Sequence, residues 1–106
     1  MFLERKWRIK KMKKYSVRYQ YFLGGATYYK PEVKVFDNYE DAQKLFLQKK
    51  DEMLGENELE EFAGQEWTDE NIKALNQVLY YEECFGEAEK DFVEINGTTV
   101  RIEEIS

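Results

Sequence analysis

Residues 91–105 read DFVEINGTTVRIEEI, two runs of alternating apolar and polar side chains on either side of an Asn-Gly pair. A two-residue turn between antiparallel strands needs positive φ at both central positions, and Asn-Gly accepts that conformation readily. The alternation gives each strand two different faces. We expect Phe92 with Glu94 to mark a solvent face and Val100 with Ile102 to mark a core face. The stretch therefore predicts a β-hairpin with one buried side.

A second hairpin is predicted earlier in the chain. Residues 15–22, YSVRYQYF, alternate in the same way, and a Gly-Gly pair at 24–25 supplies a flexible reversal. The returning strand is expected over residues 27–36. Because proline cannot donate a hydrogen bond to a sheet, Pro31 places this strand at a sheet edge or at a bulge.

A helix with marked ends is predicted between the hairpins, over DNYEDAQKLFLQKKDEMLG, residues 37–55. Asp37 is the expected N-cap, supported by Glu40, and Gly55 is expected to end the helix. The stem of Lys49 should lie along the apolar side with its ammonium group in water. The side predicted to face the core consists of Ala42, Leu45, Phe46, Lys49 and Met53.

Two further helical segments are expected before the C-terminal hairpin. One or two turns are predicted around Phe62, and a longer helix is predicted from a Thr68 N-cap to a terminating Gly86. Residues 77–84, QVLYYEEC, also fit a strand, because Val and Tyr favour extended chain. The inward side predicted for the longer helix is Ile72, Leu75, Val78 and Leu79.

These elements together predict an α+β fold. We expect a mostly antiparallel four-stranded sheet, built from two hairpins in the order ββααββ, with the helices packed on one face. The chain has 106 residues, of which 42% are hydrophobic and 16% aromatic, enough for one buried core. A single domain is therefore predicted over residues 15–106.

Residues 1–14 differ from the rest of the chain in charge. The first 16 residues hold seven Lys or Arg and one acidic residue, although the whole chain has a net charge of −6. Trp7-Arg8 can be encoded as TGG-AGG, which contains the GGAGG of a bacterial ribosome-binding site, three codons before Met12. We therefore expect Met12 to be the native start, and residues 1–14 to be a basic leader that includes translated upstream sequence. The alternatives are a short amphipathic membrane anchor and a contact with the acidic helices.

The inventory of reactive side chains argues against an enzyme. The chain has no His, which removes Ser-His and Cys-His nucleophiles and His-containing zinc sites. Its one cysteine, Cys84, follows two glutamates that disfavour a thiolate. No Ca²⁺-loop spacing is met, so we expect no catalytic residue, no metal site and no cofactor. The unpaired thiol and the lack of about 20 consecutive apolar residues predict a cytoplasmic protein with no membrane contact.

The strongest functional signal in the sequence is a cluster of acidic residues. Residues 51–70 contain nine acidic side chains and no basic one. Such a surface can bind a basic protein and can steer the encounter over a long range. We therefore expect a non-enzymatic binding protein that engages the basic surface of a protein partner, for example a nucleic-acid-binding protein. The residues predicted to contact that partner are Glu56, Glu58, Glu60, Glu61, Glu66, Asp69 and Glu70.

Two other interpretations stay open. The first hairpin could bind nucleic acid directly by stacking bases on its Tyr residues beside Lys13, Lys14 and Arg18, although the net negative charge disfavours this. The chain could also be a structural domain without a ligand. The oligomeric state is open as well, since the edge implied by Pro31 could pair with a second strand.

In size, acidity and order of strands and helices, the chain resembles the small accessory proteins of bacterial phages and mobile elements. Some of these proteins inhibit host nucleic-acid enzymes by imitating DNA. The resemblance implies a binding protein of a bacterium or its mobile elements, at most a DNA-mimic-like inhibitor.

Overall fold

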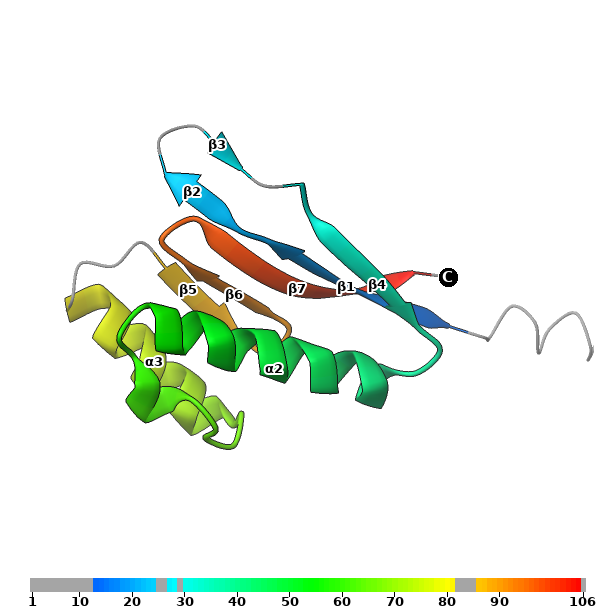
Figure 1. Ribbon diagram of the computed structural model, residues 1–106. Coiled ribbons are helices and arrows are strands. Elements are labelled where there is room, and N and C mark those ends of the chain that lie inside the picture. Colours follow the sequence, from blue (N-terminus) through cyan, green and yellow to red (C-terminus); the bar gives the residue numbers. More distant parts are fainter. Residues whose placement is uncertain (1–12, 25–26, 29, 82–85, 106) are drawn as a thin grey trace, which may run out of the picture.

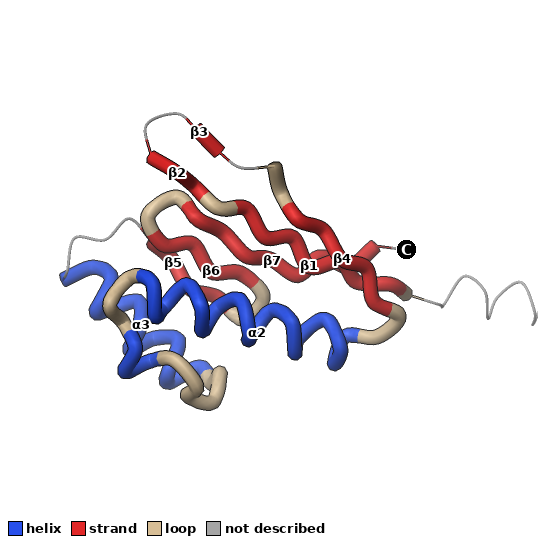
Figure 2. The backbone as a smooth tube through the Cα atoms, viewed as in Figure 1, coloured by secondary structure: helices blue, strands red, loops and turns tan. Residues whose placement is uncertain are grey.

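The computed structural model describes residues 13–24, 27–28, 30–81 and 86–105. In this part of the chain, a twisted antiparallel sheet lies on one side and the helices cover one of its faces (Figures 1 and 2). The α+β class predicted from the sequence is confirmed. The five strands, in order across the sheet, are β4 (Glu32–Phe36), β1 (Lys14–Gln20), β7 (Thr98–Ile105), β6 (Phe92–Ile95) and β5 (Gly86–Glu89).

The prediction of a four-stranded sheet is wrong, because β5 adds a fifth strand. Its sequence, GEAE, has a single buried side chain, Ala88, and no apolar alternation that marks a strand. Gly86 begins this strand and does not end a helix as predicted. A Cβ at Gly86 would lie 2.6 Å from the Glu94 carbonyl oxygen, so glycine allows the close approach of β5 to β6.

The C-terminal hairpin forms as predicted. Asn96 and Gly97 have φ values of 51° and 91°, the positive values that a two-residue turn requires. Val100 and Ile102 are buried, whereas Phe92 lies on the other face with the Arg101 guanidinium 4.7 Å from its ring.

The first hairpin spans the predicted residues but is less regular than predicted, because it is divided into two parts. β1 pairs with β4, and β4 is the outer strand, as Pro31 predicted. Beyond this pair the hairpin continues as a separate two-stranded sheet of β2 (Phe22–Gly24) and β3 (Thr27–Tyr28). The other neighbour of β1 is β7, which occupies the middle of the sheet.

Helix α2 (Tyr39–Glu56) confirms the predicted helix but corrects both of its caps. Asn38, not Asp37, is the N-cap, and its side-chain oxygen accepts a hydrogen bond of 2.8 Å from the Asp41 backbone N–H. At the other end the helix continues through Gly55 to Glu56, and Asn57 is the C-cap.

A single 3₁₀ turn, η1 (Glu60–Phe62), and helix α3 (Asp69–Tyr81) complete the helical layer. The short turn at Phe62 and the Thr68 cap were predicted, and the Thr68 hydroxyl accepts from the Asn71 backbone N–H at 3.2 Å. Of the ambiguous residues 77–84, those up to Tyr81 are helical. The remaining residues, including Cys84, lie outside the described residues.

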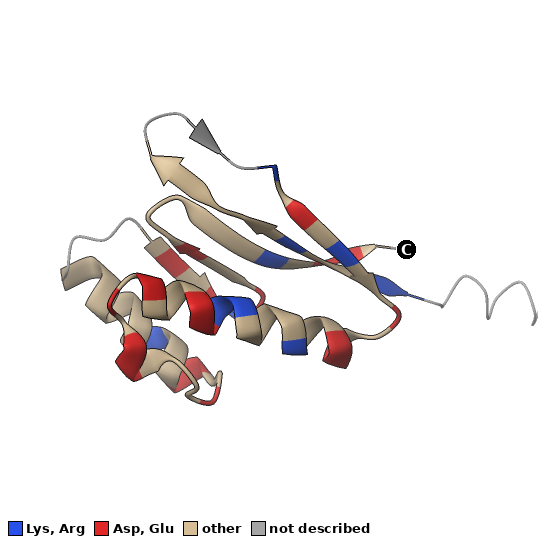
Figure 3. Cartoon of the chain, in the orientation of Figure 1, with Lys and Arg blue, Asp and Glu red and all other residues tan. Residues whose placement is uncertain are grey.

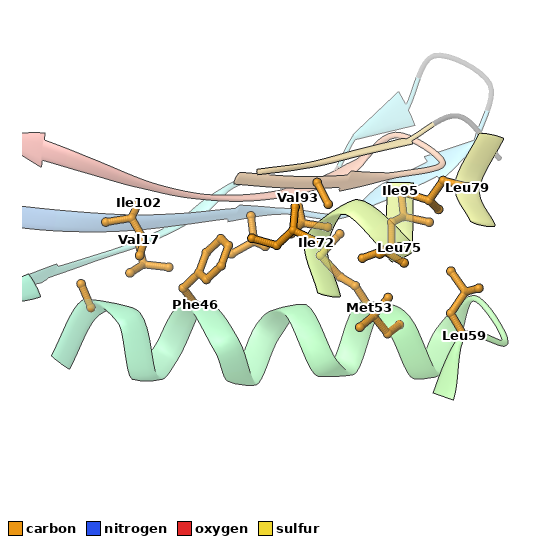
Figure 4. Packing of buried hydrophobic residues seen from close by; sticks show 14 residues of the cluster. Val17, Phe46, Met53, Leu59, Ile72, Leu75, Leu79, Val93, Ile95 and Ile102 are labelled. Carbon is orange, nitrogen blue, oxygen red and sulfur yellow. The ribbon is translucent and has the colours of Figure 1, made fainter. Parts of the chain in front are cut away.

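The core fills the space between the sheet and the two helices. Figure 4 shows Phe46 of α2 pointing from the helix toward the sheet, near Val17 and Ile102 of the strands, with Met53 further along the helix toward Leu59. Leu75 and Leu79 of α3 are also fully or almost fully buried. In the described part of the chain, none of the helices is both long and apolar enough to span a bilayer.

Candidate functional site

The seven acidic residues predicted to bind a partner lie in one continuous stretch of the helical layer. It runs from the last residue of α2 through η1 to the first turn of α3, and we call it the acidic connection. Figure 3 shows Asp and Glu on the last turns of α2 and along the segment that follows. All seven side chains are exposed: Glu56, Glu58, Glu60, Glu61, Glu66, Asp69 and Glu70.

A Schellman motif reverses the chain at the start of the acidic connection. The Leu59 backbone N–H donates to the Leu54 carbonyl at 2.8 Å, and the Glu58 N–H donates to the Gly55 carbonyl at 3.4 Å. This motif needs a residue with positive φ, and that residue is Glu58, with φ of 60°. Leu59 is buried beneath the turn. The reversal therefore anchors one apolar side chain and leaves the neighbouring carboxylates in solvent.

Side chains other than the seven carboxylates hold the connection in place. The Asp51 carboxylate accepts a hydrogen bond of 3.0 Å from the Gly64 N–H. The Gln65 side chain donates to the Glu61 carbonyl at 2.8 Å, and the Asn71 side chain donates to the Glu66 carbonyl at 2.7 Å. In addition, the Trp67 indole N–H donates to the Lys90 carbonyl at 3.0 Å. The backbone is thus fixed by bonds that do not use the exposed acids.

A buried lysine, Lys50, lies beside the acidic connection, and its burial was not predicted from the sequence. Only 1% of the Lys50 side chain is exposed, and its ammonium nitrogen lies 2.6 Å from an Asp51 carboxylate oxygen and 4.8 Å from the centre of the Trp67 ring. The prediction had placed Lys49 on the core side. The available signal was the spacing of four between Phe46 and Lys50, which puts both on one helix face.

Lys49 occupies a half-buried position nearby. Its ammonium nitrogen lies 3.6 Å from a Glu52 oxygen, 3.8 Å from a Glu32 oxygen and 5.0 Å from the centre of the Tyr19 ring. Burial raises the pKa of the Tyr19 hydroxyl to about 12, and the negative charges of Glu56 and Glu52 add to the effect.

The nine acids of residues 51–70 therefore divide into two groups. Asp51 and Glu52 form ion pairs with the two lysines that precede them, Lys50 and Lys49. The seven acids of the connection have no Lys or Arg nitrogen within 4.0 Å among the described residues. The structure therefore leaves the negative charge of the connection uncompensated.

Two exposed tyrosines lie at the end of α3 opposite to the acidic connection. Tyr80 and Tyr81 are 80% and 81% exposed, and their rings form an edge-to-face pair with centres 5.7 Å apart. An open groove of about 590 Å³ runs between α3 and β5, with both tyrosines and Asp69 among its lining residues. Exposed tyrosines are frequent at protein interfaces. The sequence signal, two adjacent Tyr late in a helix, had been interpreted only as a preference for strand.

The residues of the alternative nucleic-acid site do not share a face. Tyr15 and Tyr19 pack against the core beneath α2, and the Tyr15 ring lies 5.6 Å from the Tyr39 ring. Arg18 lies between them on β1 and therefore projects from the opposite face. Lys13 and Lys14 are within 4.0 Å of acidic oxygens of Glu104 and Asp37.

No group of three or more acidic or cysteine side chains that could hold a metal ion occurs in the described ranges. No protein-family model, curated protein or solved structure matches the chain.

Proposed function

We propose that this chain is a small, non-enzymatic binding protein whose acidic connection engages a basic protein surface. The observation that supports this proposal is the contrast within residues 51–70. Two acids are paired with lysines, while seven are exposed and unpaired on a backbone that other side chains hold in place.

A fixed backbone matters for binding because less conformational freedom is lost when the complex forms. The carboxylates would attract a Lys/Arg-rich surface before contact and would release part of their hydration when they pair with it. A groove that normally holds nucleic acid has the required charge. A DNA-mimic-like inhibitor of a nucleic-acid-binding protein, from a bacterium or a mobile element, is therefore the specific form of the proposal.

Tyr80 and Tyr81 give the proposed interface an apolar component. The carboxylates at the start of α3 would raise the rate of association. The two tyrosine rings would add contact area that loses its water readily when the complex forms. A partner that lies along α3 would meet both.

The test compares two variants with the same change in net charge. The first carries Glu58→Gln, Glu60→Gln, Glu61→Gln and Glu66→Gln in the acidic connection. The matched control carries Glu40→Gln, Glu87→Gln, Glu103→Gln and Glu104→Gln, four exposed acids outside the acidic connection and outside the groove. Each protein is immobilised, exposed to bacterial lysate and washed with rising salt, and its fold is checked by circular dichroism.

We expect wild type and the control variant to retain the same basic protein and to release it as salt rises or when duplex DNA is added. The first variant should stay folded and lose that protein. Retention of the same protein by the first variant would refute the proposal.

A further inference from the structure

The two edges of the five-stranded sheet differ in what covers their outer backbone groups. At the β5 edge, the Asn76 side chain of α3 forms two hydrogen bonds with one residue: its oxygen accepts from the Ala88 N–H at 2.8 Å, and its nitrogen donates to the Ala88 carbonyl at 2.8 Å. This amide takes the place of a neighbouring strand. The edge is therefore closed to pairing.

Among the described residues, no side-chain amide covers the opposite edge, β4, in this way. β1 is its partner on one side, and no strand among the described residues pairs with its other side. Val33 and Val35 remain 57% and 52% exposed, on the sheet face opposite the helices. Figure 1 shows β4 as the outer strand of the sheet, displaced to one side of α2. An open edge with exposed β-branched residues is a template for another strand.

We propose that β4 pairs with β4 of a second copy of this chain, antiparallel, around a twofold axis at Val33. The sequence of the edge, KPEVKVF at residues 30–36, supports this pairing. Such a contact is isologous, so the same strand must complement itself.

Symmetry limits the registers that are available. Directly opposite residues of an antiparallel pair point to the same face of the sheet. A twofold axis perpendicular to the sheet therefore lies midway between one residue and its copy on the second strand, and it pairs the residues on either side of that position in reverse order. Within β4 the axis can lie at Glu32, Val33, Lys34, Val35 or Phe36.

Charge selects among these registers. An axis at Glu32 or at Lys34 sets two like charges directly opposite each other, which is unfavourable. An axis at Val35 sets Val33 opposite the charged Asp37 of the second copy, and an axis at Phe36 sets Val35 opposite the same residue. An axis at Val33 sets Glu32 opposite Lys34 twice, Val33 opposite Val33, and Val35 opposite Pro31 twice. In this register alone, every charged residue of the edge between 31 and 35 meets the opposite charge.

The two faces of the contact also match. Glu32 and Lys34 are the residues of β4 opposite Tyr19 and Val17, which face the helices, so both ion pairs would form on that side. The exposed Val33 and Val35 would cover each other and Pro31 on the open side. A charged residue such as Lys34 on an edge strand normally discourages pairing. Here it would specify the register.

The test uses charge reversal in two separately made full-length chains, Lys34→Glu and Glu32→Lys. In the proposed register each variant places like charges opposite each other in its own homodimer. When the two variants are mixed, both ion pairs are restored between different chains. Lys44→Glu, at an exposed lysine of α2, is the matched control for a charge reversal away from the edge. The weight-average mass is measured by sedimentation over a concentration series.

We expect wild type and Lys44→Glu to rise from one chain to two chains with concentration. Each edge variant alone should dimerise at least about tenfold more weakly, and the equimolar mixture should recover wild-type association. A chain that stays monomeric at millimolar concentration would overturn the proposal. A dimer whose stability neither charge reversal changes would also overturn it. The same holds for a monomeric chain whose β4 edge binds a different protein. Circular dichroism of each variant separates lost pairing from lost folding.

Discussion

Glu58 adopts a backbone conformation that costs free energy for any residue with a side chain. Its φ of 60° lies in the left-handed region, and the other described non-glycine residue with positive φ is Asn96, in a turn that suits it. The position after a helix C-cap is usually occupied by glycine. A glutamate there adds to the exposed charge of the acidic connection at the expense of the stability of the turn.

We expect Glu58→Gly to raise the free energy of unfolding by about 0.5–1 kcal/mol, because relief of the left-handed strain exceeds the added backbone entropy of glycine. Urea denaturation measures the change. Glu58→Ala removes the same charge but keeps the strain, so it should gain less. Equal gains in the two variants would assign the effect to repulsion between carboxylates instead.

At the scale of the elements, one aromatic contact ties the start of α2 to the turn between β5 and β6. The Tyr39 hydroxyl donates to the Asp91 carboxylate, and the Tyr39 ring packs edge-on against Tyr15. Burial and this hydrogen bond raise the pKa of Tyr39 from 10.0 to about 12. The folded protein therefore holds the hydroxyl proton more strongly than the unfolded chain does.

A pH dependence follows from that raised pKa. The stabilisation from Tyr39 is complete below about pH 10 and is lost as pH rises through about 12. We expect Tyr39→Phe to lower the free energy of unfolding at neutral pH and to make its decline between about pH 10 and 12 shallower than in wild type. Urea denaturation at a series of pH values measures both. If the difference between the two proteins were the same throughout this range, Tyr39 would not be the group that titrates.

Local signals in the sequence predicted some elements well and others poorly. The Asn-Gly hairpin and α2 were predictable because turn chemistry and a long apolar period mark them within a few residues. β5 was not, because it has one buried side chain and is defined by its partners, Asn76 and β6. The burial of Lys50 had one sequence signal, its spacing of four from Phe46, but its ion pair with Asp51 and its contact with Trp67 depend on the fold of the connection.

For the candidate site, the sequence predicted the acidic residues but not their surroundings. Charge is visible along the chain, whereas the pairing of Asp51 and Glu52 with lysines depends on helix geometry. For the two tyrosines at the end of α3 the sequence indicated only a preference for strand, because the groove that they line depends on the position of β5.

At the scale of the whole molecule, the closed β5 edge limits the proposed association to the β4 edge. We expect Asn76→Ala to lower the free energy of unfolding by about 1–3 kcal/mol, because it leaves the buried N–H and carbonyl of Ala88 without partners. It should also permit assemblies larger than two chains, since both edges would then be open.

Sedimentation velocity and thermal denaturation measure these two effects. Gln77→Ala, at the exposed neighbouring position, is the matched control and should change neither. If the Asn76→Ala variant is destabilised but forms no assembly larger than that of wild type, the amide supports the fold and does not prevent pairing at the β5 edge.

The position of β7 has a consequence for the order of events during synthesis. β1 is the first described element to leave the ribosome and β7 is the last, yet the two are neighbours in the middle of the sheet, with Lys14 opposite Ile105. Until β7 emerges, β1 and β4 on one side and β5 and β6 on the other have no strand to join them. Contacts this distant along the chain form slowly. The nascent chain must therefore carry an incomplete sheet until its final strand is inserted at the centre.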